Sequence, residues 1–189
     1  RAKPAIIDKY RAAKAHGGQK NPIYAAMIES IDEGFGRIVA ALDERSTALA
    51  PGGVFAGVWL QGCTRGCKGW GSPEYQDPGT IRRLMTWTEL VQWFRQLEGV
   101  HGICLTGGEP FQQAEALLPA AREIVRAGYF ACSYSGYRFE DLEAGALPGS
   151  GELLECLDLL IDGEFVQELA MPGPFRGSSN QRVLYLTER

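Results

Sequence analysis

The sequence has little that would place the chain in a membrane, on a nucleic acid or outside the cell. It has no apolar run of the roughly 18 residues that a membrane span requires and no signal peptide at its start. Lysine and arginine number 19 against 23 aspartates and glutamates, and the basic residues form no stripe. This charge balance argues against nucleic-acid binding by bulk electrostatics, and we expect a cytoplasmic protein.

Cysteine is also scarce. There are five, an odd number, and without a secretory context this favours reduced thiols or metal ligands over disulfides. With 45% hydrophobic and 22% charged residues the chain can build a core, and 189 residues suit one domain or one domain with an extra segment. Because the first residue is Arg, we expect a piece of a longer reading frame or a trimmed chain.

Two of the cysteines, Cys63 and Cys67, stand four apart on a Gly-rich turn that follows the apolar run Val54–Leu60. Glycine permits positive φ angles and close backbone approach, so such a turn can wrap around an inorganic cluster with both thiols pointing into one hollow. The alternative interpretation is a pair of unrelated thiols.

From Gly53 onward strand patterns alternate with helix patterns. The helix after Thr86 begins with a capping box that Glu89 completes. Helices of this length between strands predict right-handed crossovers and a parallel sheet, so the predicted fold class is α/β, a partial (βα)-barrel with outer helices. The expected strands are 54–60, 103–106, 129–134, 157–161 and 182–186, and the later helices are 112–127 and 138–143.

Ligands of parallel α/β sheets bind where strands end and helices begin. Four successive strands of this chain are followed there by polar or Gly-rich loops. We expect these loops to meet at one rim. They hold Cys63 with Cys67, Gly107–Pro110, Ser135–Tyr137 and Asp162–Gly163.

Residues 1–50 are predicted to be a separate helical segment, with apolar residues recurring at three- and four-residue steps through Ile38 and Leu42. Residues 3–44 resemble an internal helical stretch of the sulfatase family, but the sulfatase nucleophile motif and metal ligands are absent from the sequence. The predicted domains are therefore 1–50 and 51–189, with Ser46–Gly53 as the junction.

Between Gly53 and Leu186 the chain resembles the radical S-adenosylmethionine enzymes, and within them the branch that activates glycyl-radical proteins, such as anaerobic ribonucleotide reductase. The resemblance implies a radical-generating activase with a glycyl-radical protein as substrate and an electron donor such as flavodoxin or ferredoxin. The pieces that carry it, in order, are WLQGCTRGCKG, LTGGEPFQQ, SYSGYRFEDL, DLLIDGEF and FRGSSNQRV.

The family's chemistry implies roles for particular residues. A 4Fe-4S cluster held by three cysteines in C-x3-C-x2-C leaves one iron open for S-adenosylmethionine, whose cleavage gives a 5′-deoxyadenosyl radical. Cys63 and Cys67 match the first two ligands. The resemblance places the remaining site residues along the cofactor: Gly69, Trp70, Gly71, Gly107, Gly108, Glu109, Pro110 and Ser135.

The third ligand position is occupied by Trp70, whose indole nitrogen is only a donor. Cys104, Cys132 and Cys156 are possible substitutes, although a strand position favours a buried, inert thiol for the first two. Two alternatives to an active activase follow: a pseudoenzyme that binds S-adenosylmethionine without radical chemistry, and a chimeric or mispredicted fragment. A sulfatase-maturing radical enzyme is a third, suggested by the front segment.

Overall fold

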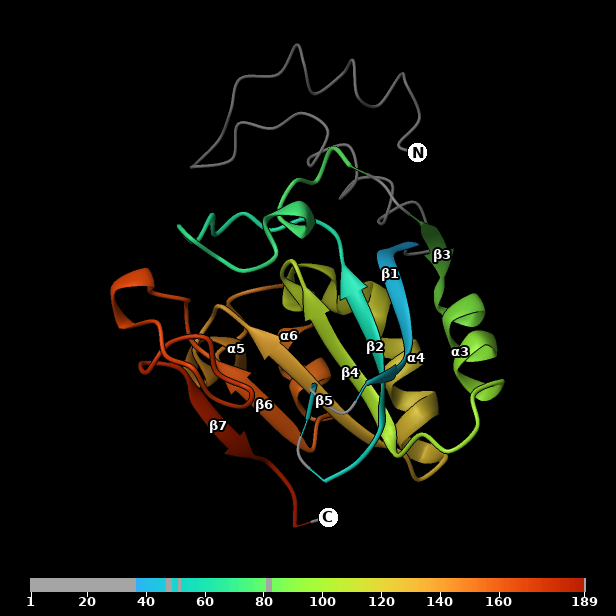
Figure 1. Cartoon of the computed structure of the whole chain (residues 1–189). Helices are drawn as coiled ribbons and strands as arrows, with labels where there is room; N and C mark the ends of the chain where they lie inside the picture. The colour runs from blue at the N-terminus through green and yellow to red at the C-terminus, as the bar shows by residue number, and fades with distance from the viewer. Residues whose placement is uncertain (1–36, 47–48, 51, 81–82, 189) are drawn as a thin grey trace.

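The computed structural model describes residues 37–46, 49–50, 52–80 and 83–188, and these form an α/β fold around a seven-stranded sheet (Figure 1). The strand order is β3-β1-β2-β4-β5-β6-β7. The strands are β1 (Arg37–Ser46), β2 (Phe55–Leu60), β3 (Leu84–Thr86), β4 (Gly102–Gly107), β5 (Phe130–Ser135), β6 (Leu159–Asp162) and β7 (Arg182–Tyr185).

The centre of the sheet is parallel, as predicted. β2 pairs with β4, β4 with β5, and β5 with β6, all in the parallel sense. The connecting helices are α3 (Trp87–Arg95), α4 (Ala114–Arg126), α5 (Phe139–Glu143) and α6 (Ser150–Leu154). The predicted capping box is present at α3, where the Glu89 backbone N–H donates to Thr86 Oγ1 over 3.2 Å and Glu89 Oε2 accepts from the Thr86 backbone N–H over 2.6 Å.

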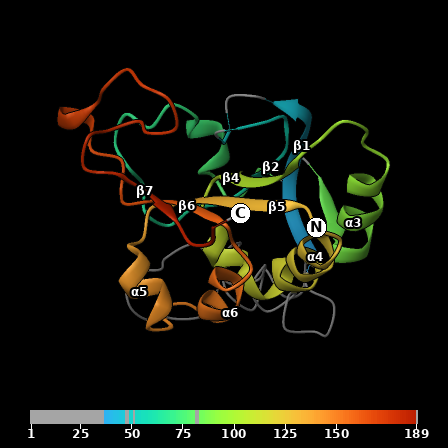
Figure 2. The same cartoon turned by 90° about the horizontal axis from the view of Figure 1, so that it is seen from below.

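The sheet separates two apolar layers. α4, α5 and α6 lie on one side of β5, whereas the loops after β2 and β6 lie on the other (Figure 2). Ile103 and Leu105 of β4 pack toward the helices with Leu117 of α4, while Cys104 packs in the opposite cluster. This alternation has the period of two that a strand imposes, and because both faces are covered every residue of β4 is buried.

Two sequence predictions fail at the edges of the sheet. The predicted N-terminal helix is wrong over Arg37–Ser46, which is strand β1, paired antiparallel with β2 and β3. Positions 38 and 42 are an even number apart, so their spacing fits one face of a strand as well as a helix, and pairing with β2 satisfies backbone groups that a bare sheet edge would leave open.

β7 also departs from the predicted parallel pattern, since it pairs antiparallel with β6. The chain between these strands contains the short 3-10 helix η3 (Gln167–Leu169) and no α-helix. Without a crossover connection, β7 runs back along β6 in the antiparallel direction.

The predicted helix cap at Asn21–Pro22 and the apolar positions before 37 lie outside the described residues, so the division into 1–50 and 51–189 stays a prediction. Within the part of the chain that the structure describes, no helix has the length and apolar character needed to cross a membrane.

Candidate cofactor site

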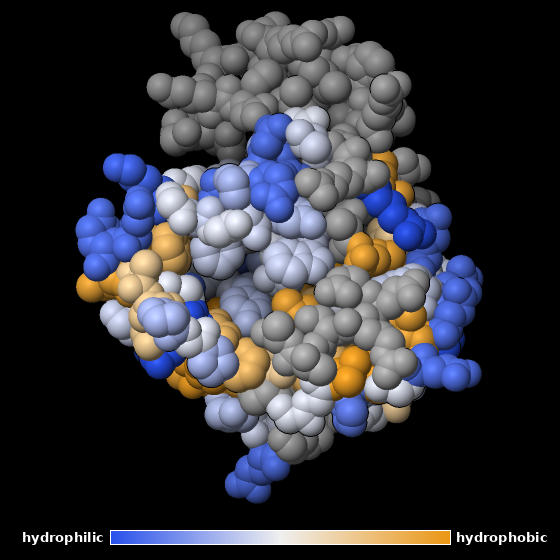
Figure 3. Space-filling model, viewed as in Figure 1, coloured by the Kyte–Doolittle hydropathy of each residue, from blue (hydrophilic) through white to orange (hydrophobic). Residues whose placement is uncertain are grey.

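An open cavity lies at the carboxyl ends of β2, β4, β5 and β6. Figure 3 shows this face of the molecule hollowed near its centre. The four loops predicted to share a rim therefore do converge. The predicted site residues that line the cavity are Cys63, Cys67, Trp70, Gly107, Gly108, Glu109 and Ser135; Gly69, Gly71 and Pro110 lie beside it without lining it.

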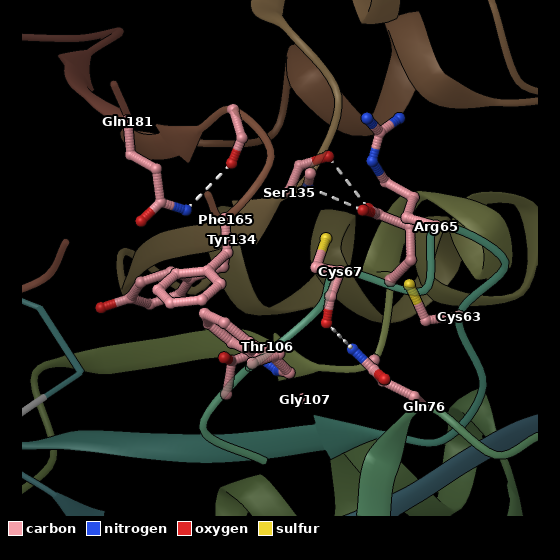
Figure 4. Close-up of a pocket in the computed structure, with 15 residues that line it drawn as sticks. Cys63, Arg65, Cys67, Gln76, Thr106, Gly107, Tyr134, Ser135, Phe165 and Gln181 are labelled. Atoms are coloured by element: carbon pink, nitrogen blue, oxygen red, sulfur yellow. Dashed lines mark hydrogen bonds between the residues drawn. The ribbon is translucent and has the colours of Figure 1, made fainter. Parts of the chain in front are cut away.

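The loop after β2 carries both thiols. Its start is fixed by backbone hydrogen bonds to the region of the 3-10 helix η1 (Pro73–Tyr75): Gly62 N–H donates to the Tyr75 carbonyl over 2.8 Å, and Cys63 N–H to the Gln76 carbonyl over 3.0 Å. Figure 4 shows the two sulfur atoms turned toward the same side of this loop. Burial raises the pKa of Cys63 to about 11 and raises that of Cys67, so both are thiols until a cation replaces the proton.

The glycine pair Gly107–Gly108, at the end of β4, is required by a close approach between two loops. A Cβ at Gly107 would stand 2.6 Å from the Leu60 carbonyl oxygen, and one at Gly108 would stand 2.4 Å from the Gly62 carbonyl oxygen. Glu109 N–H donates to that same Gly62 carbonyl over 3.0 Å. The missing side chains thus let the thiol-bearing loop rest directly on the turn after β4.

Glu109 is the N-cap of the 3-10 helix η2 (Pro110–Gln113) and is only 1% exposed. Its carboxylate accepts from the Phe111 N–H over 3.1 Å, the Ser135 hydroxyl over 2.9 Å and the Gly136 N–H over 2.8 Å. Burial nevertheless raises the pKa of Glu109 to about 7. A carboxylate has about four lone-pair sites, so these three donors leave roughly one for a cationic group in the cavity.

The sequence analysis missed Arg65 and Glu164. The Arg65 guanidinium pairs with Glu164 Oε2 over 2.8 Å and lies 4.7 Å above the Tyr137 ring. Glu164 Oε1 is in turn 3.9 Å from Cys67 Sγ. Glu164 directly follows Asp162–Gly163 at the carboxyl end of β6. Because ligands of parallel sheets bind where strands end, the argument that selected Asp162 and Gly163 applies to Glu164 as well.

Trp70, at the expected third ligand position, lines the cavity and packs against Phe165, with ring centroids 5.5 Å apart and planes at 62°. Cys104 and Cys132 pair in register on β4 and β5, fully buried, and Cys156 follows α6; none of the three lines the cavity. Among the described residues no group of three Cys, His, Asp or Glu could hold a single metal ion.

The C-terminal motif closes the cavity from the side of β7. Gln181 accepts from the N–H groups of Gly177 and Ser178 and donates to the Gly163 carbonyl over 2.9 Å. Arg182 pairs with Asp162 and Glu140. These contacts fix the start of the last strand, β7, against β6 and its loop.

Comparison with known proteins agrees with this site. Residues 50–184 match the family described as a 4Fe-4S single cluster domain, and the chain belongs to that family. Among its curated relatives are anaerobic ribonucleoside-triphosphate reductase-activating proteins. The one from Salmonella typhi is 33% identical over 92 residues, which are 45% of this chain and 56% of the relative. The one from Haemophilus influenzae is 28% identical over 141 residues, 67% of this chain and 84% of the relative.

The resemblance to the activating branch is thereby confirmed, although the chain spans only about half the length of the first relatives it matches. The crystal structure of QueE from Escherichia coli aligns with 58% of this chain and 56% of its own, at 17% identity and a TM-score of 0.41, which bears on neither fold nor function. The likeness of residues 3–44 to sulfatases stays a prediction.

Proposed function

We propose that this chain is a radical S-adenosylmethionine activating enzyme that installs a glycyl radical on a partner protein, the partner being an anaerobic ribonucleotide reductase as the relatives' name suggests. The observation that carries the proposal is the convergence of the Cys63–Cys67 loop with Glu109 and Ser135 on one cavity, in a chain that belongs to a 4Fe-4S family. The same family makes a pseudoenzyme the less favoured alternative.

Within the cavity, Cys63 and Cys67 would hold a 4Fe-4S cluster. When bound, such a cluster supplies the electron that cleaves S-adenosylmethionine to a 5′-deoxyadenosyl radical. The remaining acceptor position of Glu109 suits the ammonium group of the methionyl moiety, and Gly107 and Gly108 line the cavity beside it. Ser135 holds Glu109 in orientation over 2.9 Å. Gly69, Trp70, Gly71 and Pro110 would border the cofactor.

The surrounding fold suits this use. We infer that the sheet serves as a partial barrel, with the parallel strands β2 to β6 presenting their carboxyl ends to the cofactor and the β6–β7 connection shielding it from water. An electron donor such as flavodoxin or ferredoxin would reduce the cluster from outside.

Anaerobic reconstitution with iron and sulfide tests the proposal. We expect a brown protein that, with a reductant, converts S-adenosylmethionine to 5′-deoxyadenosine, measured by chromatography. With a purified anaerobic ribonucleotide reductase present, electron paramagnetic resonance should show a glycyl radical. If the chain takes up no iron and cleaves no S-adenosylmethionine, yet titration calorimetry on metal-free protein shows binding, the pseudoenzyme is the right description.

A further inference from the structure

One glutamine side chain connects three of the loops at the rim. Gln112 lies in the loop after β4, and it contacts both Thr64 of the loop after β2 and Tyr137 of the loop after β5. We infer that Gln112 is a positioning residue, which holds the thiol-bearing loop in its place at the cavity before any cofactor binds. This inference rests on the proposed function, because that loop would carry the cluster ligands.

Three hydrogen bonds make the connection. Gln112 Oε1 accepts from the Thr64 backbone N–H over 3.1 Å, and Gln112 Nε2 donates to Thr64 Oγ1 over 2.5 Å. Nε2 also donates to the Tyr137 hydroxyl over 3.1 Å. Because an amide side chain has both donor and acceptor atoms, this one residue can bind a backbone N–H and two hydroxyl groups at once.

The fold fixes both supports of this connection. Gln112 stands two residues after Pro110, whose ring restricts the backbone at the start of η2. The Tyr137 backbone N–H donates to Ser135 Oγ over 3.1 Å, and the Tyr137 carbonyl accepts from the Gly163 N–H over 3.2 Å. Gln112 therefore ties the thiol-bearing loop to two turns that are themselves anchored.

Thr64 lies where the thiol-bearing loop folds back onto its first thiol. It directly follows Cys63, and the backbone N–H groups of the next two residues, Arg65 and Gly66, donate to the Cys63 sulfur. The bonds from Gln112 hold the start of this fold. Hydrogen bonds to ligand sulfurs are a usual means by which proteins tune iron–sulfur clusters, so fixing Thr64 also fixes the surroundings of Cys63.

Two other contacts hold the same loop, but neither binds the backbone between the two thiols. Gln113 donates to the Gln61 carbonyl over 3.1 Å, which fixes the loop before Cys63. Arg65 pairs with Glu164 over 2.8 Å through side chains that are both partly exposed, and exposed ion pairs contribute little. Gln112 is therefore the stronger hold on the segment that follows Cys63.

The exchange of backbone amide hydrogens tests the inference on the metal-free full chain, residue by residue, by NMR. The Arg65 and Gly66 amides donate to Cys63 in the folded loop, so their exchange rates measure how often the loop opens. The amides of β5 are the internal reference, because they lie in the centre of the sheet and exchange when the sheet itself opens.

Three variants separate the hydrogen bonds from the bulk of the side chain. Gln112→Met removes the bonds and keeps a side chain of similar length. Gln112→Glu keeps an acceptor, to which the hydroxyls of Thr64 and Tyr137 can turn and donate. Gln92→Met is the matched control, because Gln92 is an exposed glutamine of α3.

A net hydrogen bond changes an equilibrium by about fivefold. We therefore expect Gln112→Met to speed the exchange of Arg65 and Gly66 by at least about tenfold, with the β5 amides unchanged. Gln112→Glu should stay within about threefold of wild type, and Gln92→Met should match it. After anaerobic reconstitution, Gln112→Met should bind iron and sulfide at least about tenfold more weakly, as losing an outer-shell partner does.

Several results would overturn the inference while leaving the proposed function in place. They are wild-type exchange of Arg65 and Gly66 in Gln112→Met, an equal rise at the β5 amides, and exchange in Gln112→Glu as fast as in Gln112→Met. Iron and sulfide bound by Gln112→Met as tightly as by wild type would overturn it too. If wild type itself binds no iron and sulfide, the proposed function fails, whereas the exchange rates still decide whether Gln112 holds the loop.

Discussion

Adding one methyl group at Gly108 tests whether the thiol-bearing loop rests on the turn after β4. The new Cβ would stand 2.4 Å from the Gly62 carbonyl oxygen and 2.8 Å from the Tyr75 carbonyl oxygen. Ordinary contacts begin at 3.4 Å, so the Gly62 carbonyl has to retreat by about 1 Å. That carbonyl accepts the Glu109 N–H over 3.0 Å, and the shift would break this bond.

The cost follows from these contacts. Overpacking of this kind costs about 1–3 kcal/mol, and the broken hydrogen bond adds about 1 kcal/mol. We therefore expect Gly108→Ala to lower the free energy of unfolding by about 3 kcal/mol, and the melting temperature by roughly 10 °C in a chain of this size. Because the displaced loop carries Cys63 and Cys67, iron uptake should fall as well.

Urea unfolding followed by tryptophan fluorescence measures the change. Two glycines serve as controls. Gly151→Ala lies in α6 with its nearest atom 3.8 Å away and should be neutral or stabilising. Gly128 has φ +89° and nothing within 4 Å of an added Cβ. Gly128→Ala therefore measures the cost of holding a side chain at positive φ, with no steric overlap. A Gly108→Ala protein within about 0.5 kcal/mol of wild type would refute the close approach of the two loops.

Three further predictions concern the buried and paired carboxylates. A carboxyl whose pKa rises from 4.5 to about 7 is protonated more readily when folded, so the contribution of Glu109 to stability is full below about pH 4.5 and falls as the pH rises to about 7. The shift is worth roughly 3 kcal/mol. The difference in free energy of unfolding between wild type and Glu109→Gln, measured in urea, should therefore shrink from pH 5 to pH 8. A difference that stays constant would contradict the raised pKa of Glu109. Asp162→Ala removes a fully buried carboxylate that accepts the Phe139 N–H over 2.7 Å and pairs with Arg182. In the same urea assay it should lower the free energy of unfolding by about 3–5 kcal/mol, as breaking a buried pair does. A loss under about 1 kcal/mol would show that water replaces these bonds. Arg182 lowers the pKa of Glu140 to about 2, so the benefit of Glu140 over Glu140→Gln should be present above pH 4.5 and vanish as the pH falls through about 2; thermal melts at both extremes check this, and a difference that persists in acid would argue against the ion pair.

Local patterns in the sequence were enough to predict the central strands, the capping box of α3 and the loops that meet at the rim. These features depend on neighbours in the chain: a run of apolar residues, a Thr and Glu three apart, a glycine after a strand. Because parallel strands end at one edge, placing each loop at a strand end also placed Cys63, Glu109 and Ser135 in one cavity without any knowledge of distances.

The tertiary structure decided what local patterns leave open. Positions 38 and 42 suit either a helix or a strand, and only pairing with β2 selects β1. The three donors to Glu109 come from two different loops, and the approach of Glu164 to Cys67 joins residues 97 positions apart. Contacts over such separations arise from the packing of whole elements, and no periodicity within either segment encodes them.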